Sequence, residues 1–167
     1  MTRVLVVCTG NAARSVMAGA LFAASGEPIE VRTAGTHALD GQPMSLRTRE
    51  ALRSIGVPPP PHRSRHLAVG DVDWADVVIA MEADHVSYVR RHHFEAASRT
   101  ATLPFLAGRL RPGRDPFGAR LARLGLAEVD PATQGEVPDP AGGDDEDYLS
   151  CAREISRLAR AVLPGLA

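Results

Sequence analysis

Several residue types are rare or missing in this chain, and each shortage excludes some classes of protein. All 19 basic residues are arginine, and they nearly balance 20 acidic residues, for a formal net charge of −1. This balance of charge argues against a general surface for nucleic acid or for an anionic membrane. Its apolar runs are too short to cross a bilayer, and a strand pattern begins at once, without a signal peptide. We therefore expect a cytoplasmic protein.

Cysteine and aromatic residues are scarce as well. Two cysteines, Cys8 and Cys151, do not make a disulfide framework, and no cysteine–histidine cluster has the spacing of a zinc site. Aromatic residues make up 4% of the chain, whereas the hydrophobic content of 44% and the charged content of 23% are ordinary for a globular protein. A length of 167 residues without a visible boundary predicts one domain spanning residues 1–167.

Short apolar runs alternate with helical patterns along the chain, which predicts an α/β fold with a parallel sheet and crossover helices. Strands are expected at residues 4–7, 29–33, 77–81 and 101–103. Helices are expected at residues 16–24, 45–55, 84–91 and 144–162. Residues 104–138 are dominated by proline, glycine and arginine, and we expect a surface excursion there with one short helix at 117–124.

The segment between the first expected strand and the first expected helix has the features of an anion-binding loop. Cys8 and Arg14 enclose five residues, and Ser15 follows. A tight loop between a strand and a helix directs backbone N–H groups and a helix N-terminus toward one spot, where a tetrahedral dianion can bind. The residues expected to surround that anion are Thr9, Gly10, Asn11, Ala12, Ala13 and Ser15.

The loop also contains a nucleophile and a fixed positive charge. The helix N-terminus, the N–H groups and Arg14 favour the thiolate form of Cys8, which makes it a candidate nucleophile. The planar guanidinium of Arg14 matches two phosphoryl oxygens. Gly10 permits close backbone approach, Asn11 suits a left-handed turn, and Ser15 can donate a hydrogen bond to the sulfur. These residue types predict attack on phosphorus.

A thiolate alone cannot complete such a reaction, because the leaving group needs a proton. Asp139 lies between Pro138 and Pro140, which restrict the backbone of its loop. We expect Asp139 to act as general acid for the leaving group and then as general base for water. The chemistry requires no metal or other cofactor.

Taken together, these motifs resemble the low-molecular-weight protein tyrosine phosphatase family. The resemblance implies a three-layer α/β/α fold with a four-stranded parallel sheet of strand order 2-1-3-4. It implies the roles argued for Cys8, Arg14 and Asp139, and it places Asn11, Thr33 and His62 in a polar network that supports the loop. It is carried by the loop motif, by Asp139-Pro140, and by residues 33–36, 62–65 and 76–81.

The chain departs from the family pattern at several positions. Ala13 replaces the second cysteine that usually precedes the arginine, and Val16 replaces a proline after Arg-Ser. The positions that commonly wall the phosphotyrosine pocket with aromatic rings hold Leu39, Ala141 and Gly142. The usual disulfide within the loop therefore cannot form, and stacking on an aryl phosphate, about 0.5–1.5 kcal/mol per aromatic pair, is reduced.

The leading hypothesis is therefore a phosphomonoester hydrolase, with protein phosphotyrosine as the family default. Its expected partners are a phosphorylated protein or small molecule and an oxyanion in the loop, and neither nucleic acid nor membrane. A phosphoarginine phosphatase and a thiol-dependent arsenate reductase are the alternatives among enzymes. A phosphate-binding module without catalysis is a third class, against which Cys8, Arg14 and Asp139 argue.

Overall fold

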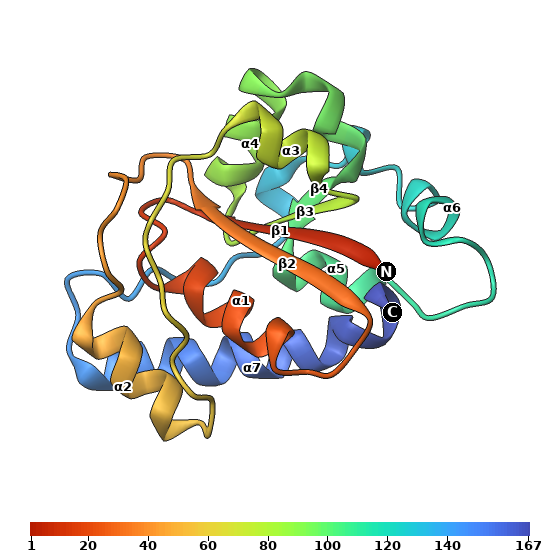
Figure 1. The fold of residues 1–167 in the computed structure, drawn as a ribbon. Coiled ribbons are helices and arrows are strands. Elements are labelled where there is room, and N and C mark those ends of the chain that lie inside the picture. Colours follow the sequence, from red (N-terminus) through yellow and green to blue (C-terminus); the bar gives the residue numbers. More distant parts are fainter.

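A four-stranded parallel sheet forms the centre of the structure, a computed structural model that describes residues 1–167 (Figure 1). Its strand order is β2-β1-β3-β4, and each neighbouring pair is parallel. The predicted order of 2-1-3-4 is thereby confirmed. The strands are β1 (Thr2–Cys8), β2 (Ile29–Gly35), β3 (Val77–Ala80) and β4 (Thr100–Thr102).

Helices cover both faces of this sheet, as expected for parallel strands joined by crossovers. In Figure 1, α1, α5 and α7 lie on one side of the sheet, and α3 and α4 lie on the other. None of the helices combines the length and apolar character that crossing a membrane requires. The α-helices are α1 (Arg14–Ala23), α2 (Leu46–Ser54), α3 (Val69–Trp74), α4 (Ala83–His92), α5 (Leu103–Arg109), α6 (Phe117–Ala122) and α7 (Asp145–Leu166). Short 3-10 helices are formed by Phe94–Arg99, Leu126–Glu128 and Pro131–Thr133.

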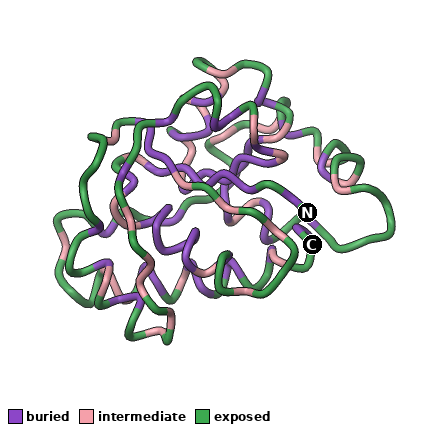
Figure 2. The backbone as a smooth tube through the Cα atoms, in the orientation of Figure 1, coloured by how far each residue is buried: buried purple, intermediate pink, exposed green.

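Strand β1 is buried on both faces, which explains its continuous apolar sequence (Figure 2). Val4, Val6 and Cys8 belong to the larger core cluster beneath α1, α5 and α7. Leu5 and Val7 point to the opposite face and join the smaller cluster beneath α3 and α4. The alternation of side chains along the strand therefore places Cys8 at the end of β1, on the side of α1.

Local signals in the sequence set several helix boundaries. The side chain of Ser45 accepts a hydrogen bond from the N–H of Thr48 at the start of α2, as an N-cap does. Asp144 and Asp147 form a reciprocal capping box at the start of α7. Gly56 follows α2 with a φ of 79°, a left-handed conformation that suits glycine. The helices expected at residues 45–55 and 144–162 are thereby confirmed as α2 and α7.

The expectation that residues 104–138 form a surface excursion is wrong for much of this stretch. Leu106, Leu110, Leu126 and Val137 are buried in the larger core cluster. Helix α5 turns this segment inward, because its apolar residues recur at helical spacing and its proline lies in the first turn, where no backbone donor is lost. The loop before α6 is the exposed part (Figure 2).

Candidate active site

The carboxyl ends of the parallel strands bring the candidate residues to one edge of the sheet, where ligands bind in open α/β folds. Cys8 pairs with Gly35 at the end of β2, and Val7 pairs with Ala80 at the end of β3. The segment that contains Asp139 reaches the same edge because the N–H of Val137 donates to the carbonyl of Met81, at 2.7 Å. Three distant parts of the chain thus meet beside the loop after β1.

Several backbone N–H groups of this loop have no hydrogen-bond acceptor within the backbone. The N–H groups of its four central residues donate to no backbone carbonyl of the protein, and the first turn of α1 follows directly. Unpaired N–H groups and a helix N-terminus together form a binding site for an anion. Gly35 lies so close to the loop that a Cβ there would approach the Thr9 carbonyl oxygen to 2.5 Å. The four residues are Gly10, Asn11, Ala12 and Ala13.

Asn11 supports the loop from within. Its φ of 51° is the only positive value at a residue other than glycine, and its side chain is fully buried. The Nδ2 group donates to the hydroxyls of Ser15 and Thr33, each at 2.9 Å. The Oδ1 atom accepts from the N–H of Arg65 at 3.0 Å, and the carbonyl oxygen accepts from Nε2 of His62 at 2.7 Å. The structure therefore joins Asn11, Thr33 and His62, as the family resemblance implies.

The Cys8 thiol faces a hydroxyl. Its Sγ atom lies 3.0 Å from Oγ of Ser15, and only 3% of Cys8 is exposed. Because Ser15 already accepts a hydrogen bond from Asn11, its own proton is free to be donated to the sulfur. A negative charge on sulfur is stabilised by such a donor.

Arg14 is almost fully buried, with 2% of its surface exposed, and each side of its guanidinium has a partner. Nη1 donates to Oε2 of Glu82 at 2.6 Å and to the carbonyl oxygen of Val137 at 3.0 Å. Nη2 lies 3.2 Å from Oδ2 of Asp139. The orientation of Arg14 at the loop is therefore set by Glu82, in the turn between β3 and α4, and by the Asp139 segment.

Sequence reasoning missed two residues of this site, Glu82 and His85. Glu82 comes soon after β3 and is the ion partner of Arg14. His85, on α4, has its Nε2 atom 2.8 Å from Oγ1 of Thr9. Burial lowers the pKa of His85 to about 4, against the opposing influence of the Glu82 carboxylate. The signal that could have found both is their position just beyond a strand at the carboxyl edge of the sheet.

The remaining predicted residues lie around the loop. The Ala12 carbonyl accepts from Oγ1 of Thr48, at 3.0 Å. Burial also lowers the pKa of His62, although its hydrogen bond to Asn11 acts in the other direction. Leu39, at 78% exposure, and the exposed Ala141 and Gly142 form no aromatic wall.

Cys151 lies on α7 behind the Asp139 segment, with its Sγ atom 3.9 Å from the carbonyl oxygen of Pro138. Burial raises the pKa of this thiol to about 12. Cys151 therefore remains a protonated thiol at neutral pH, and such a thiol is a poor nucleophile.

The fold and the loop together define a class of α/β enzymes that bind a tetrahedral oxyanion between backbone amides, an arginine and a thiol. Residues 3–109 match the family model described as low molecular weight phosphotyrosine protein phosphatase. The chain belongs to this family of enzymes.

Relatives and solved structures agree with this assignment over almost the whole chain. The chain is 32% identical to a protein-arginine-phosphatase of Geobacillus stearothermophilus, over 93% of this chain and 90% of the relative. It is 30% identical to a low molecular weight protein-tyrosine-phosphatase of Streptomyces coelicolor, over 96% and 91%. The structure of the YwlE arginine phosphatase from Geobacillus stearothermophilus superposes with a TM-score of 0.79 at 31% identity, covering 98% of this chain and 91% of that one. The low molecular weight protein tyrosine phosphatase from T. tengcongensis gives 0.78 at 30% identity and 97% coverage of both chains.

Proposed function

We propose that this enzyme removes phosphoryl groups from protein side chains through a phosphocysteine intermediate, with Cys8 as nucleophile. The observation that carries the proposal is the convergence of Cys8, Arg14 and Asp139 on one loop. The thiol is 3.0 Å from a hydroxyl donor, and the guanidinium is 3.2 Å from the carboxyl group. A nucleophile, an anion clamp and a proton donor within reach of one phosphoryl group are what a two-step displacement needs.

In the first step, the Cys8 thiolate attacks phosphorus and forms the S–P bond as the bond to the leaving atom breaks. Asp139 gives its proton to the leaving atom. In the second step, Asp139 accepts a proton from water while the water oxygen attacks phosphorus. The S–P bond then breaks, inorganic phosphate is released, and Ser15 stabilises the returning thiolate. Arg14 and the loop amides bind the phosphoryl oxygens in both transition states.

The nucleophile is tested by the substitution Cys8→Ser, assayed on an aryl phosphate. We expect turnover to disappear and binding of vanadate or phosphate to persist, because the amides and Arg14 are unchanged. Rapid acid quench of the wild-type enzyme should trap phosphate on Cys8, and mass spectrometry would locate it. Wild-type-like turnover by the variant, or a phosphorylated residue other than Cys8, would refute the proposal.

A second candidate substrate is phosphoarginine, in which the bond to be broken is P–N. The absence of aromatic residues at Leu39, Ala141 and Gly142 supports it, because an aryl group would find no stacking partner there. The full-length similarity to a protein-arginine-phosphatase also supports it. Phosphotyrosine remains the first candidate substrate, because the matching family model is that of phosphotyrosine phosphatases.

One kinetic panel separates these substrates. Peptides that carry phosphotyrosine, phosphoarginine or phosphoserine are compared by kcat/KM on a single preparation, and arsenate is added with a low-molecular-weight thiol. A preference for phosphoarginine peptides would select the second candidate. Thiol-dependent release of arsenite would instead select the arsenate reductase alternative.

A further inference from the structure

A pocket of about 440 Å³ adjoins the candidate phosphate loop. It runs along α4 and is closed on its other side by the segment after β2. Thr9, of the loop itself, and Glu82 line the end nearest Cys8. Arg91 and His92, at the end of α4, line the far end. We call it the α4 groove.

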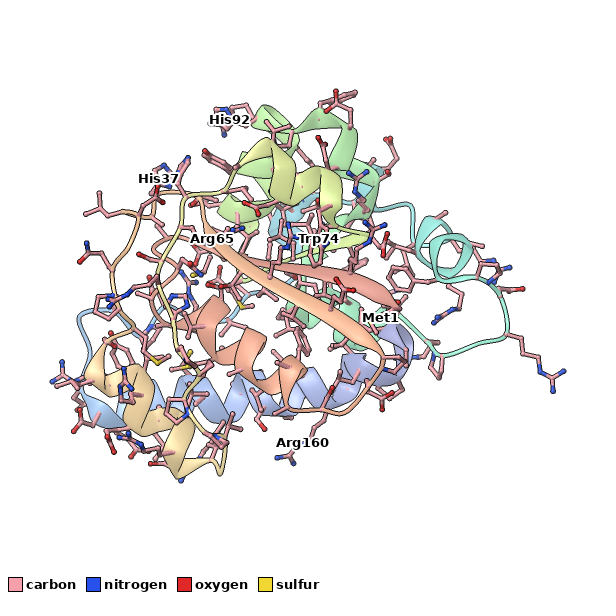
Figure 3. The ribbon with its side chains drawn as sticks, in the orientation of Figure 1. Met1, His37, Arg65, Trp74, His92 and Arg160 are labelled. Atoms are coloured by element: carbon pink, nitrogen blue, oxygen red, sulfur yellow. The ribbon has the colours of Figure 1, made fainter.

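Three rings form a continuous row in the α4 groove. The ring of His37 lies edge-on to Tyr88, with 5.6 Å between centroids, and Tyr88 packs against His92 at 4.4 Å. The position of His37 is set by a hydrogen bond between its Nδ1 and Oγ1 of Thr36, at 3.0 Å. His37 and His92 lie on the same side of the molecule (Figure 3). The aromatic surface that this chain lacks at Leu39, Ala141 and Gly142 is thus present instead along α4.

Charge is divided between the two ends of the α4 groove. Asp84 lies in the first turn of α4 and Arg91 in the last, seven residues and thus about 10 Å apart along the helix axis. Glu82 is already neutralised by Arg14, whereas Arg91 is in no ion pair. The unpaired positive charge therefore lies at the end remote from the nucleophile.

We propose that the α4 groove binds the substrate protein next to its phosphorylated residue, and that Arg91 selects an acidic side chain about three residues away. An extended chain advances about 3.3–3.6 Å per residue. Three residues therefore span the groove from Asp84, which follows Glu82 at the loop end, to Arg91 at the far end. Asp84 disfavours an acidic side chain closer to the phosphorylated residue by like-charge repulsion. This inference rests on the proposed function, since the phosphoryl group must occupy the loop.

Selectivity is measured with phosphopeptides of the residue class that the kinetic panel favours, otherwise built of uncharged residues. A single glutamate is moved through positions −4 to +4, and each peptide has a glutamine counterpart. In wild type we expect kcat/KM to rise about two- to fivefold for glutamate at one position three or so residues away, the range for an exposed ion pair. Arg91→Gln should abolish this rise. Arg91→Glu should reverse the preference, so that a peptide with lysine at the same position is hydrolysed with a higher kcat/KM than the glutamate peptide.

Arg114→Gln is the matched control, because Arg114 is exposed, is in no ion pair, and lies in the loop before α6, far from α4 (Figure 1). Turnover of a small aryl phosphate should be unchanged in all three variants. An equal glutamate preference in wild type and Arg91→Gln would overturn the inference, as would an equal loss in Arg114→Gln.

Failure of the proposed chemistry is distinguishable from failure of the groove. If wild type hydrolyses neither aryl phosphate nor phosphopeptide, the proposed function fails. The groove is then judged by the affinities of the same peptides for Cys8→Ser, with and without Arg91→Gln, measured by fluorescence anisotropy. Equal affinities for the glutamate and glutamine peptides, or absence of binding, would refute the groove itself.

Discussion

Nη2 of Arg14 lies 3.2 Å from Oδ2 of Asp139, so the proposed phosphate clamp and the proposed proton donor touch each other directly. A phosphoryl dianion competes with Asp139 for the same guanidinium. We therefore expect substrate binding to release the carboxyl group from Arg14, so that it can face the leaving atom. The second partner of Arg14, Glu82, lies 2.6 Å from Nη1, and we expect this ion pair to keep the guanidinium oriented during the exchange.

This relationship predicts the behaviour of Asp139→Asn. For substrates with poor leaving groups we expect kcat/KM to fall about 10²- to 10³-fold, within the usual range for general acid catalysis. For an activated aryl phosphate the fall should be about tenfold or less, because that leaving group departs without a proton. A series of substituted aryl phosphates measures the difference. Equal losses across the series would argue against Asp139 as the acid.

A second prediction concerns the strained position in the loop. Asn11→Ala removes three side-chain hydrogen bonds, one of them buried and two partly buried, and should lower the free energy of unfolding by about 2–4 kcal/mol. Asn11→Gly loses the same bonds but accepts the φ of 51° and should be about 1 kcal/mol less destabilised than the alanine variant. Urea denaturation measures both. If alanine proved as stable as glycine, strain at this position would be excluded as a factor.

The third prediction is a loss of stability in mild acid. Burial lowers the pKa of His85 to about 4 from 6.5, so between these values the unfolded chain binds a proton that the folded chain does not. Stability therefore falls as pH falls through this window.

The expected contribution of His85 between pH 7 and pH 5 is about 2 kcal/mol. His85→Asn should reduce the pH dependence by that amount and leave the contribution of His62, whose pKa is also lowered. Urea denaturation at the two pH values provides the measurement. An unchanged difference in the variant would contradict the assignment.

Oxidation provides a fourth prediction, because Ala13 replaces the cysteine that could protect the nucleophile. Cys151 is 7% exposed, and its thiol, with a pKa raised to about 12, is a poor partner for disulfide formation. Hydrogen peroxide should inactivate the enzyme, with little activity recovered by dithiothreitol after prolonged exposure.

Ala13→Cys should make most of that activity recoverable, while Cys151→Ala should leave the outcome unchanged. Activity after peroxide and after reduction is measured for all three proteins. Detection of a Cys8–Cys151 disulfide by mass spectrometry in oxidised wild type would contradict this prediction.

Much of the fold could be predicted from local sequence patterns. The run from Val4 to Val7 predicted a buried strand, the glycine-containing loop predicted an anion site, and Ser45 and Asp144 marked helix starts. These signals depend on neighbours in the chain, so they can be read without knowing the topology. The expectation of a surface excursion at residues 104–138 is wrong for much of the segment because its helices are short and interrupted by proline and glycine, which weakens their apolar period. Leu106 and Leu126 are buried because they pack against the larger core cluster. That contact is not visible in the local sequence.

The sequence by itself determined the reactive loop, because Cys8, Arg14 and the amides between them lie within seven consecutive residues. Only the tertiary structure decided which other residues surround this loop. Glu82, His85 and Asp139 reach the loop only because β3 pairs with β1 and the Val137 N–H binds at the end of β3. Contacts between residues so far apart depend on strand register and packing, which no local pattern contains.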